Sequence, residues 1–299
     1  MNRAPLLIHH SANRGRHYPP SSLLGLKNCL DVQARVVEVD IIPLVGGDFA
    51  LFHDDRMEHG TDDHGDIATC TAQQVGRLHH LWQGTVSDIP VGLLSEAIAL
   101  IGSYPQLQEL QLDLKPYVPL NDAVLGNLLQ LIEPVKPHIR ITCVADWAVR
   151  HIRTLDPTAL LGFDPLLYFD VQTTGSPSGA EPPFRVGAYG YRDDHPLAAR
   201  KWGTVVDYLA ARADALHAQV PTGTMWYIDA SVLAATLDDG FDWVGYLHRE
   251  GAQVAAWTLD AEHPADVLLA RRLVATAVDR ITTNDAPAMS GALDVPTQY

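Results

Sequence analysis

Short runs of apolar, β-branched residues alternate with longer segments of helical periodicity along most of the chain. Eight runs have the length and composition of strands, and six of the segments between them repeat apolar residues every three or four positions. This eightfold alternation predicts a TIM (β/α)8 barrel. The expected strands are Leu6–His10, Arg35–Ile42, Glu109–Lys115, Arg140–Asp146, Leu160–Asp164, Met225–Ala230, Gln253–Leu259 and Arg280–Asn284, and the expected helices are Ser21–Leu30, Val91–Ile101, Asp122–Ile132, Leu197–Val220, Ser231–Glu250 and Pro264–Thr276.

Two segments depart from the alternation. Phe49–His53 is a ninth candidate strand, and the glycines and aspartate before it indicate a hairpin that extends the second strand. Thr173–Pro196 follows neither period and comes after the fifth strand, so we expect a long loop on the C-terminal face, either a specificity loop or lid or a plain surface excursion. No boundary signal divides residues 1–288, expected as one domain, and residues 289–299 are expected as a loose tail.

Composition narrows the classes of partner. The 299 residues are 47% hydrophobic and 19% charged, which is typical of a globular chain with a substantial core. A formal net charge of −15 opposes binding to nucleic acid or to an anionic membrane surface. Cys29, Cys70 and Cys143 lie far apart, which argues against a disulfide scaffold or a thiolate zinc site. With no apolar run long enough for a signal peptide or a membrane span, we expect a cytoplasmic protein, and the oligomeric state stays open.

Carboxylates inside the expected strands need an explanation. Glu38 and Asp40 are two residues apart and therefore share one face of their strand. Gln111, Asp113 and Lys115 share a face in the same way on another strand. Burying like charges together is costly unless a cation neutralises them, and carboxylate oxygens are ligands that Mg²⁺ or Ca²⁺ prefers. An ordinary salt bridge is the plain alternative for each carboxylate taken alone.

Two of the fourteen histidines follow expected strands beside these carboxylates. His10 ends the first strand and His53 ends the hairpin strand, so both can reach the same end of the barrel. His9, His59, His64, His79 and His80 are interpreted as surface or core residues. A divalent metal, a lysine and two imidazoles suit phosphoryl transfer at a diester, because one imidazole can accept a proton from the attacking hydroxyl while the other protonates the leaving alkoxide.

Ordered sequence blocks resemble the glycerophosphodiester phosphodiesterases across almost the whole chain. The most specific part is Glu38-x-Asp40 followed thirteen residues later by His53-Asp54, with Asp113-x-Lys115-Pro116 downstream. The other matching blocks are Leu7–His10, Pro20–Leu23, Ala256–Leu259 and Ile281–Asp285.

The resemblance implies a TIM barrel that hydrolyses small glycerophosphodiesters. It also implies roles for individual residues. His10 and His53 would be the catalytic acid and base, and Glu38, Asp40 and Asp113 would hold a divalent metal, Mg²⁺ or Ca²⁺. Lys115 would contact the phosphate, and Trp257 would line the site. A five-membered cyclic phosphate is an expected intermediate, because a neighbouring glycerol hydroxyl can attack the phosphorus.

Several blocks depart from the family pattern. His10-Ser11-Ala12 replaces His-Arg-Gly, so the arginine contact to the phosphate is either missing or made by Arg14 or Arg16. Ser21 replaces the glutamate of the Pro-Glu-Asn-Thr block. Asp113 and the His10-x-x-Asn13 spacing are similar to the related sphingomyelinase D and phospholipase D branch, whereas Gly60–Asp66 is similar to the glycerophosphodiester branch. The alternatives are therefore a headgroup-releasing enzyme of the lysophospholipase D or sphingomyelinase D kind, or a non-catalytic barrel that binds phosphate.

Overall fold

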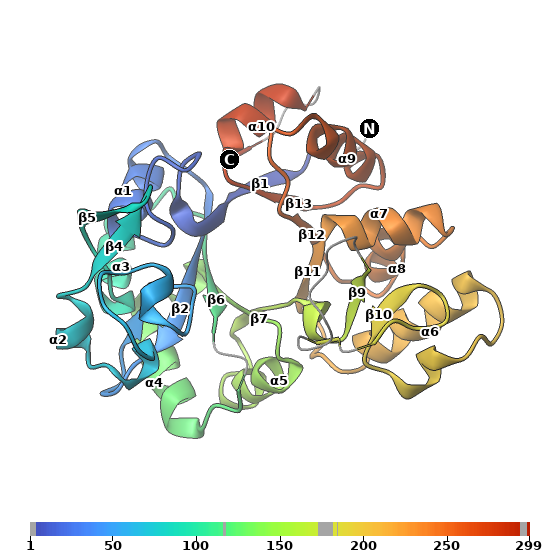
Figure 1. The fold of residues 1–299 in the computed structure, drawn as a ribbon, viewed down its shortest axis with the longest axis horizontal. Coiled ribbons are helices and arrows are strands. Elements are labelled where there is room, and N and C mark those ends of the chain that lie inside the picture. The colour runs from blue at the N-terminus through green and yellow to red at the C-terminus, as the bar shows by residue number, and fades with distance from the viewer. Residues whose placement is uncertain (1–3, 116–117, 173–181, 184, 294–297) are drawn as a thin grey trace.

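The barrel expected from the alternation is confirmed. The computed structural model describes residues 4–115, 118–172, 182–183, 185–293 and 298–299. Eight parallel strands pair in the order β1-β13-β12-β11-β8-β7-β6-β2, and pairing of His9 with Val37 closes β2 onto β1. Figure 1 shows these strands as an inner ring surrounded by helices. Their bounds are β1 (Leu6–His9), β2 (Val36–Pro43), β6 (Glu109–Leu114), β7 (Ile139–Cys143), β8 (Leu160–Phe163), β11 (Met225–Asp229), β12 (Val254–Trp257) and β13 (Arg280–Thr283).

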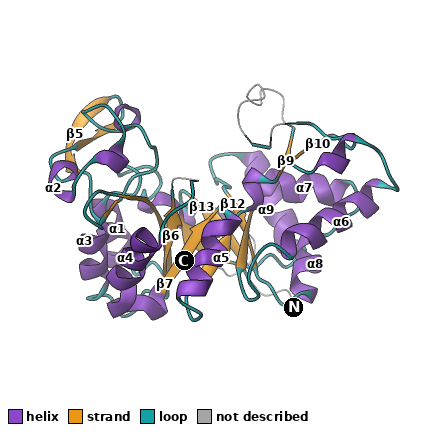
Figure 2. Cartoon of the chain, turned by 90° about the horizontal axis from the view of Figure 1, so that it is seen from below, coloured by secondary structure: helices purple, strands orange, loops and turns teal. Residues whose placement is uncertain are grey.

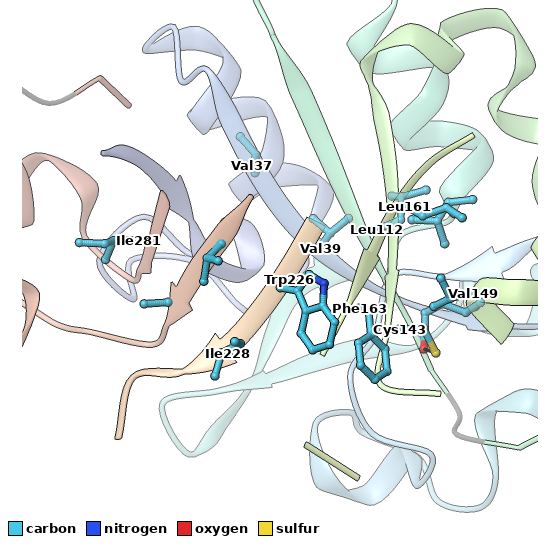
Figure 3. Close-up of a cluster of buried hydrophobic side chains, with 14 of the residues drawn as sticks. Val37, Val39, Leu112, Cys143, Val149, Leu161, Phe163, Trp226, Ile228 and Ile281 are labelled. Atoms are coloured by element: carbon cyan, nitrogen blue, oxygen red, sulfur yellow. Dashed lines mark hydrogen bonds between the residues drawn. The ribbon is translucent and has the colours of Figure 1, made fainter. Parts of the chain in front are cut away.

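The helices pack on the outward faces of the strands. Outward residues such as Val37, Val39 and Leu112 are fully buried between strand and helix. Figure 3 shows part of this apolar layer, in which Val149 of α5 lies near Cys143 and Leu161. Burying a side chain of this kind contributes roughly 1.5–3 kcal/mol, so the layer holds the barrel closed. The helices are α1 (Leu23–Asp31), α3 (Leu94–Ile101), α4 (Asp122–Ile132), α5 (Asp146–Leu155), α6 (Val205–His217), α7 (Ala230–Asp238), α8 (Trp243–Arg249), α9 (Pro264–Ala275) and α10 (Ala286–Ala292).

The inward faces are unusually polar, and the N-terminal end of the barrel is filled by a buried ion network. Glu109 Oε1 accepts hydrogen bonds from Arg140 Nε at 3.0 Å and from Arg280 Nη1 at 2.6 Å. Burial raises the pKa of Glu109, but the guanidinium groups of Arg280 and Arg140 outweigh this effect and hold the pKa below its usual value. The carboxylate at this end is therefore compensated by side chains of the protein itself.

Insertions at the opposite, C-terminal end rise above the barrel (Figure 2). The expected hairpin is present: β3 (Phe49–Ala50) pairs antiparallel with the end of β2, after a turn in which Gly46 and Gly47 have φ of 98° and 97°. Beyond β3 lie the short helix α2 (Ala72–Val75) and a hairpin that the sequence pattern did not predict, formed by β4 (His79–Trp82) and β5 (Thr85–Pro90).

The segment after the fifth barrel strand is partly ordered into a ribbon. β9 (Phe169–Val171) pairs with β10 (Tyr191–Asp193), which lies inside the expected irregular loop. Stacking of Phe169 on Tyr191 at 5.0 Å between ring centroids holds the two strands together. Residues 173–181 and 184 of that loop lie outside the described residues.

Two expected helices are each divided in the structure. Leu197–Val220 contains a short 3-10 turn at Pro196–Ala199 and α6, separated by Gly203 with φ of 68°. Ser231–Glu250 contains α7 and α8, separated by Gly240 with φ of 88°. Left-handed backbone at each glycine ends a helical path that the apolar period alone would have continued.

Two further expectations are wrong in detail. The strand expected over Arg140–Asp146 ends at Cys143, and Asp146 begins α5, whose buried face includes Val149 and Ile152. The expected loose tail starts inside α10, where Met289 is fully buried, and Leu7 N donates to the Gln298 carbonyl at 2.8 Å. Among the described residues, no helix is both long enough and apolar enough to cross a membrane.

Candidate active site

A cavity of about 290 Å³ opens at the C-terminal ends of the barrel strands. The period of two along each strand determines which side chains face it, because inward residues alternate with the outward core residues. Seven of the residues singled out from the sequence line this cavity, namely His10, Glu38, Asp40, His53, Asp113, Lys115 and Trp257.

Three carboxylates converge at one side of the cavity. Oxygen atoms of Glu38, Asp40 and Asp113 all lie within 4.8 Å of one another. Asp40 and Asp113 are direct partners in the pairing of β2 with β6, so the barrel backbone itself places them together. Glu38 and Asp40 are only 4% and 3% exposed, so little water is available to screen their mutual repulsion.

Two serines in the loop after β1 hold the buried carboxylates in place. Ser11 N donates to Glu38 Oε2 at 2.7 Å, and Ser21 Oγ donates to Asp40 Oδ2 at 2.9 Å. Both serines have left-handed backbone, with φ of 45° and 56°. Such conformations carry strain for a residue with a side chain, and here they direct polar groups at the carboxylates. Ser21 therefore makes a specific contact at the position where the family pattern has glutamate.

The acidic cluster divides into two electrostatic environments. Burial raises the pKa of Glu38 well above its usual value, and the charges of Asp40 and Asp113 raise it further. Burial also raises the pKa of Asp40, but Lys115, His53 and His10 outweigh this effect and leave the pKa below its usual value. Lys115 Nζ lies 2.5 Å from Asp113 Oδ2 and 3.5 Å from Asp40 Oδ1.

The donor set fits a hard divalent cation. Three carboxylates offer oxygen ligands from a compact set, which is the coordination chemistry that Mg²⁺ and Ca²⁺ favour. The raised pKa of Glu38 reflects the like charges that such a cation would neutralise. Glu38, Asp40 and Asp113 would therefore hold the metal. The chemistry of the ligands favours neither of the two ions over the other.

The imidazole of His10 is oriented by Asn284. Asn284 Nδ2 donates to Asp260 Oδ2 at 2.8 Å, and Asp260 is paired with Arg16 at 2.8 Å, as expected for a carboxylate. This arrangement turns the amide oxygen of Asn284 toward His10 Nδ1, 2.9 Å away. An amide oxygen only accepts, so Nδ1 carries the proton in neutral His10. Nε2, which lies 3.9 Å from Glu38 Oε2, is then free to accept a proton.

His53 approaches the cavity from the loop after β3 and is more exposed. Its side chain is 59% exposed, against 37% for His10. His53 Nδ1 lies 3.1 Å from Asp54 Oδ1, and since a carboxylate accepts, Nδ1 is the donor. Each histidine thus has Nδ1 engaged by an oxygen and Nε2 available for proton transfer.

Four side chains that line the cavity carry buried polar atoms that have no hydrogen-bond partner among the described residues. The four atoms are Gln111 Oε1, Tyr227 Oη, Trp257 Nε1 and Thr282 Oγ1. Buried polar groups are nearly always paired, so these atoms are suited to binding a polar ligand in the cavity. The sequence placed Gln111 on the face shared with Asp113 and Lys115, and the resemblance indicated Trp257.

The structure does not bring the expected arginines to the cavity. Arg14 is absent from the described lining, and its Nε donates to Asn28 Oδ1 at 3.1 Å. Arg16 pairs with Asp260 and Glu262 behind Asn284. Left-handed backbone at both arginines turns this loop away from the strand direction, and the sequence gives no signal of that path.

Several site residues were missed by sequence reasoning. Ser21 and Asn284 lie within the matching blocks and Ser11 directly follows one, but their contacts to Asp40, His10 and Glu38 depend on loop conformation. Asp164 lines the cavity from the end of β8. Its place at a strand end is the one signal that could have identified it.

Comparison with solved structures places the fold among the glycerophosphodiester phosphodiesterases. The chain is similar to a Silicibacter pomeroyi protein named for glycerophosphoryl diester phosphodiesterase activity, with a TM-score of 0.70, 18% identity and coverage of 98% of this chain and 94% of that one. It is also similar to an Oleispira antarctica phosphodiesterase in complex with the product sn-glycerol-3-phosphate, with a TM-score of 0.65, 18% identity and 98% coverage of each chain.

A glycerophosphoryl diester phosphodiesterase from Parabacteroides distasonis gives a TM-score of 0.62 at 18% identity, covering 97% of this chain and 86% of that chain. No family model matches the sequence, and no curated protein matches it. At these identities the likeness establishes the shared fold.

We predict that replacing Asn284 with alanine abolishes the tautomer preference of His10. Without the amide oxygen, Nδ1–H loses its acceptor and the two neutral tautomers become close in energy. Nitrogen-15 chemical shifts of the imidazole would report the change, with His53, which is held by Asp54 instead, as the internal control. A His10 spectrum identical to that of the unaltered protein would contradict the inferred role of Asn284.

Proposed function

We propose that this chain is a glycerophosphodiester phosphodiesterase that uses a divalent metal to hydrolyse a small glycerophosphodiester to an alcohol and glycerol phosphate. The observation that carries the proposal is one cavity lined by three clustered carboxylates, Lys115 and two histidines. The cavity lies in a fold shared with enzymes named for this reaction, one of them in complex with sn-glycerol-3-phosphate.

The chain's own residues supply positioning and proton transfer. Lys115 lies at the carboxylate cluster, from which its ammonium can also contact a non-bridging phosphate oxygen. Nε2 of one histidine accepts the proton of the attacking hydroxyl, and Nε2 of the other, protonated, donates to the leaving alkoxide. A divalent cation held by the carboxylates would stabilise negative charge on the phosphoryl oxygens.

We propose that the attacking group is the neighbouring glycerol hydroxyl. Its oxygen forms a bond to phosphorus while the bond from phosphorus to the alcohol oxygen breaks, which yields a five-membered cyclic phosphate and the free alcohol. Water then opens the ring with the two histidines in exchanged roles. Tethering favours this route, because an intramolecular nucleophile can reach effective molarities of about 10⁵–10⁸ M.

A second candidate is a headgroup-releasing enzyme of the sphingomyelinase D or lysophospholipase D kind, which would end at the cyclic phosphate. The observation that favours it is the environment of His10. Asn13 Nδ2 donates to the same Asn284 oxygen at 2.6 Å, so the His10-x-x-Asn13 spacing has a structural role beside the imidazole. A cytoplasmic location and a small soluble substrate stay predictions.

Phosphorus NMR tests the activity and the route together. We expect glycerophosphocholine and glycerophosphoethanolamine to be hydrolysed, with a transient signal from a cyclic five-membered phosphate early in the time course. A matched diester without the neighbouring hydroxyl should turn over very slowly or not at all. Equal rates for that analogue, with no cyclic signal, would establish direct attack by water, and a cyclic end product would favour the second candidate.

Removal of divalent ions should abolish turnover and lower the melting temperature. Without a cation, Glu38, Asp40 and Asp113 repel one another in a buried site, and a ligand that binds only the folded state stabilises that state. Activity and thermal stability should both return with Mg²⁺ or Ca²⁺. A Glu38→Gln variant removes one ligand charge and should need more metal for the same recovery. Full activity after exhaustive chelation would disprove the metal requirement.

Replacing His10 or His53 with alanine should lower kcat by at least about 10² while the fold remains intact, because one partner in proton transfer is lost. The matched control is His9→Phe. His9 precedes His10 in the sequence, is only 1% exposed and does not line the cavity, and its ring nitrogens have no hydrogen-bond partner among the described residues. Near-normal kcat in either alanine variant, or a large loss in the control, would place the catalytic pair elsewhere.

A further inference from the structure

Asp164 faces the carboxylate cluster and His10 from across the cavity. It follows directly after β8, and its side chain lines the cavity together with Val144 and Leu166. Around the closed ring, β8 is the fourth strand from β1 in either direction, so Asp164 lies opposite His10. A substrate whose phosphorus is held between the histidines would therefore extend one of its two arms toward Asp164.

Among the described residues, the partly buried carboxyl group of Asp164 has no cationic partner within ion-pair distance. Its Oδ1 accepts from the backbone N of Leu166 at 2.9 Å, and none of the ion pairs among the described residues includes it. By contrast, Glu109 is paired with Arg140, and Asp193 with Arg212 at 3.0 Å. A desolvated charge without a partner is costly, so a cation from outside the chain would stabilise an ionised Asp164.

The surroundings of Asp164 add negative charge to this position. Burial raises the pKa of Asp164 well above its usual value, and the charges of Asp113 and Asp229 raise it further, whereas Lys115 opposes them only weakly. Among the described residues that line the cavity, Lys115 is the one permanently cationic side chain, and its ammonium lies at Asp113 and Asp40.

The charges in the cavity can also be counted with a divalent metal ion included. A divalent cation and Lys115 would together balance Glu38, Asp40 and Asp113, so an ionised Asp164 and the substrate's phosphodiester would be the charges left uncompensated. This step rests on the proposed function. An ammonium group on the β8 side would offset the charge of an ionised Asp164 and favour that form, against the burial that raises its pKa.

The wall near Asp164 is suited to an ammonium that carries alkyl groups. Tyr227 and Trp257, from the two strands that follow β8 around the ring, line the same cavity, with Val144 and Leu166 as apolar neighbours. Aromatic rings attract alkylammonium ions through their negative faces, and a nearby carboxylate supplies the full charge. Within the described part of the chain, neither Tyr227 Oη nor Trp257 Nε1 has a hydrogen-bond partner.

We propose that Asp164 is a specificity-determining residue that receives a cationic ammonium group carried by the alcohol part of the substrate. The substrate class is accordingly a glycerophosphodiester of an amino alcohol, with a quaternary or primary ammonium, in preference to one of a neutral polyol. A neutral polyol would form hydrogen bonds to Asp164 but would leave its charge uncompensated.

The test compares glycerophosphocholine with glycerophosphoglycerol, which share the phosphodiester and differ in the charge of the alcohol. The unaltered protein should prefer glycerophosphocholine in kcat/KM. Asp164→Asn keeps the oxygen that accepts from Leu166 N and removes the charge, so the preference should fall by about tenfold or more, mainly through KM for glycerophosphocholine. Asp242→Asn is the matched control, because Asp242 likewise caps a helix through its side chain but does not line the cavity. The control variant should keep the substrate preference of the unaltered protein.

A preference for glycerophosphoglycerol in the unaltered protein, or an Asp164→Asn variant with the same preference as the unaltered protein, would overturn the proposal. Should the Asp164→Asn variant not fold, an Asp164→Ser variant takes its place, because serine keeps a side-chain oxygen that can accept from Leu166 N. A second measurement does not depend on turnover: choline alone, titrated into the protein, should shift the Trp257 indole resonance, and the shift should weaken in the variant. Failure to hydrolyse any diester would reject the proposed function, whereas failure to bind choline would reject the role of Asp164.

Discussion

Mutual repulsion among three clustered carboxylates, two of them buried, is the constraint around which the cavity is organised. Glu38, Asp40 and Asp113 would separate in a flexible chain, but Asp40 and Asp113 are paired residues of β2 and β6 and cannot move apart without opening the barrel. The free energy that holds them comes from the apolar layer between strands and helices, which is far larger than one unfavourable charge contact. The barrel therefore maintains a cluster of oxygens that Lys115 neutralises only in part and that a bound cation would stabilise further.

The two ends of the barrel differ in whether their carboxylates are paired with cationic side chains. At the N-terminal end Glu109 is bonded to two arginines, so that end is complete without a ligand. At the C-terminal end negative charge exceeds positive charge, and Asp164 has no cationic partner among the described residues. This contrast explains why one end serves stability and the other is suited to binding a metal and a polar substrate. Parallel strands make the separation possible, because all eight carboxyl ends lie on one face.

Residues in the loops after the strands hold the carboxylates and His10 in place through hydrogen bonds. Left-handed Ser11 and Ser21 direct an amide and a hydroxyl at Glu38 and Asp40, in blocks that depart from the family pattern. Asn284 orients His10 across 274 positions of sequence and is itself held by Asp260. The departures in sequence thus coincide with specific contacts, which supports a working site over a barrel that has lost its chemistry.

The sequence by itself determined the alternation of strand and helix, the inward position of Glu38, Asp40, Asp113 and Lys115, and the placement of both histidines near strand ends. These features follow from local periodicity, since a strand alternates its faces wherever it lies. Tertiary structure alone decided that Asn284 meets His10, that Arg14 turns to Asn28, that Gly203 and Gly240 interrupt helical periods, and that Asp164 lies opposite the histidine. Such relations depend on barrel closure and on left-handed loop residues, which bring together groups distant in sequence and which no local pattern encodes.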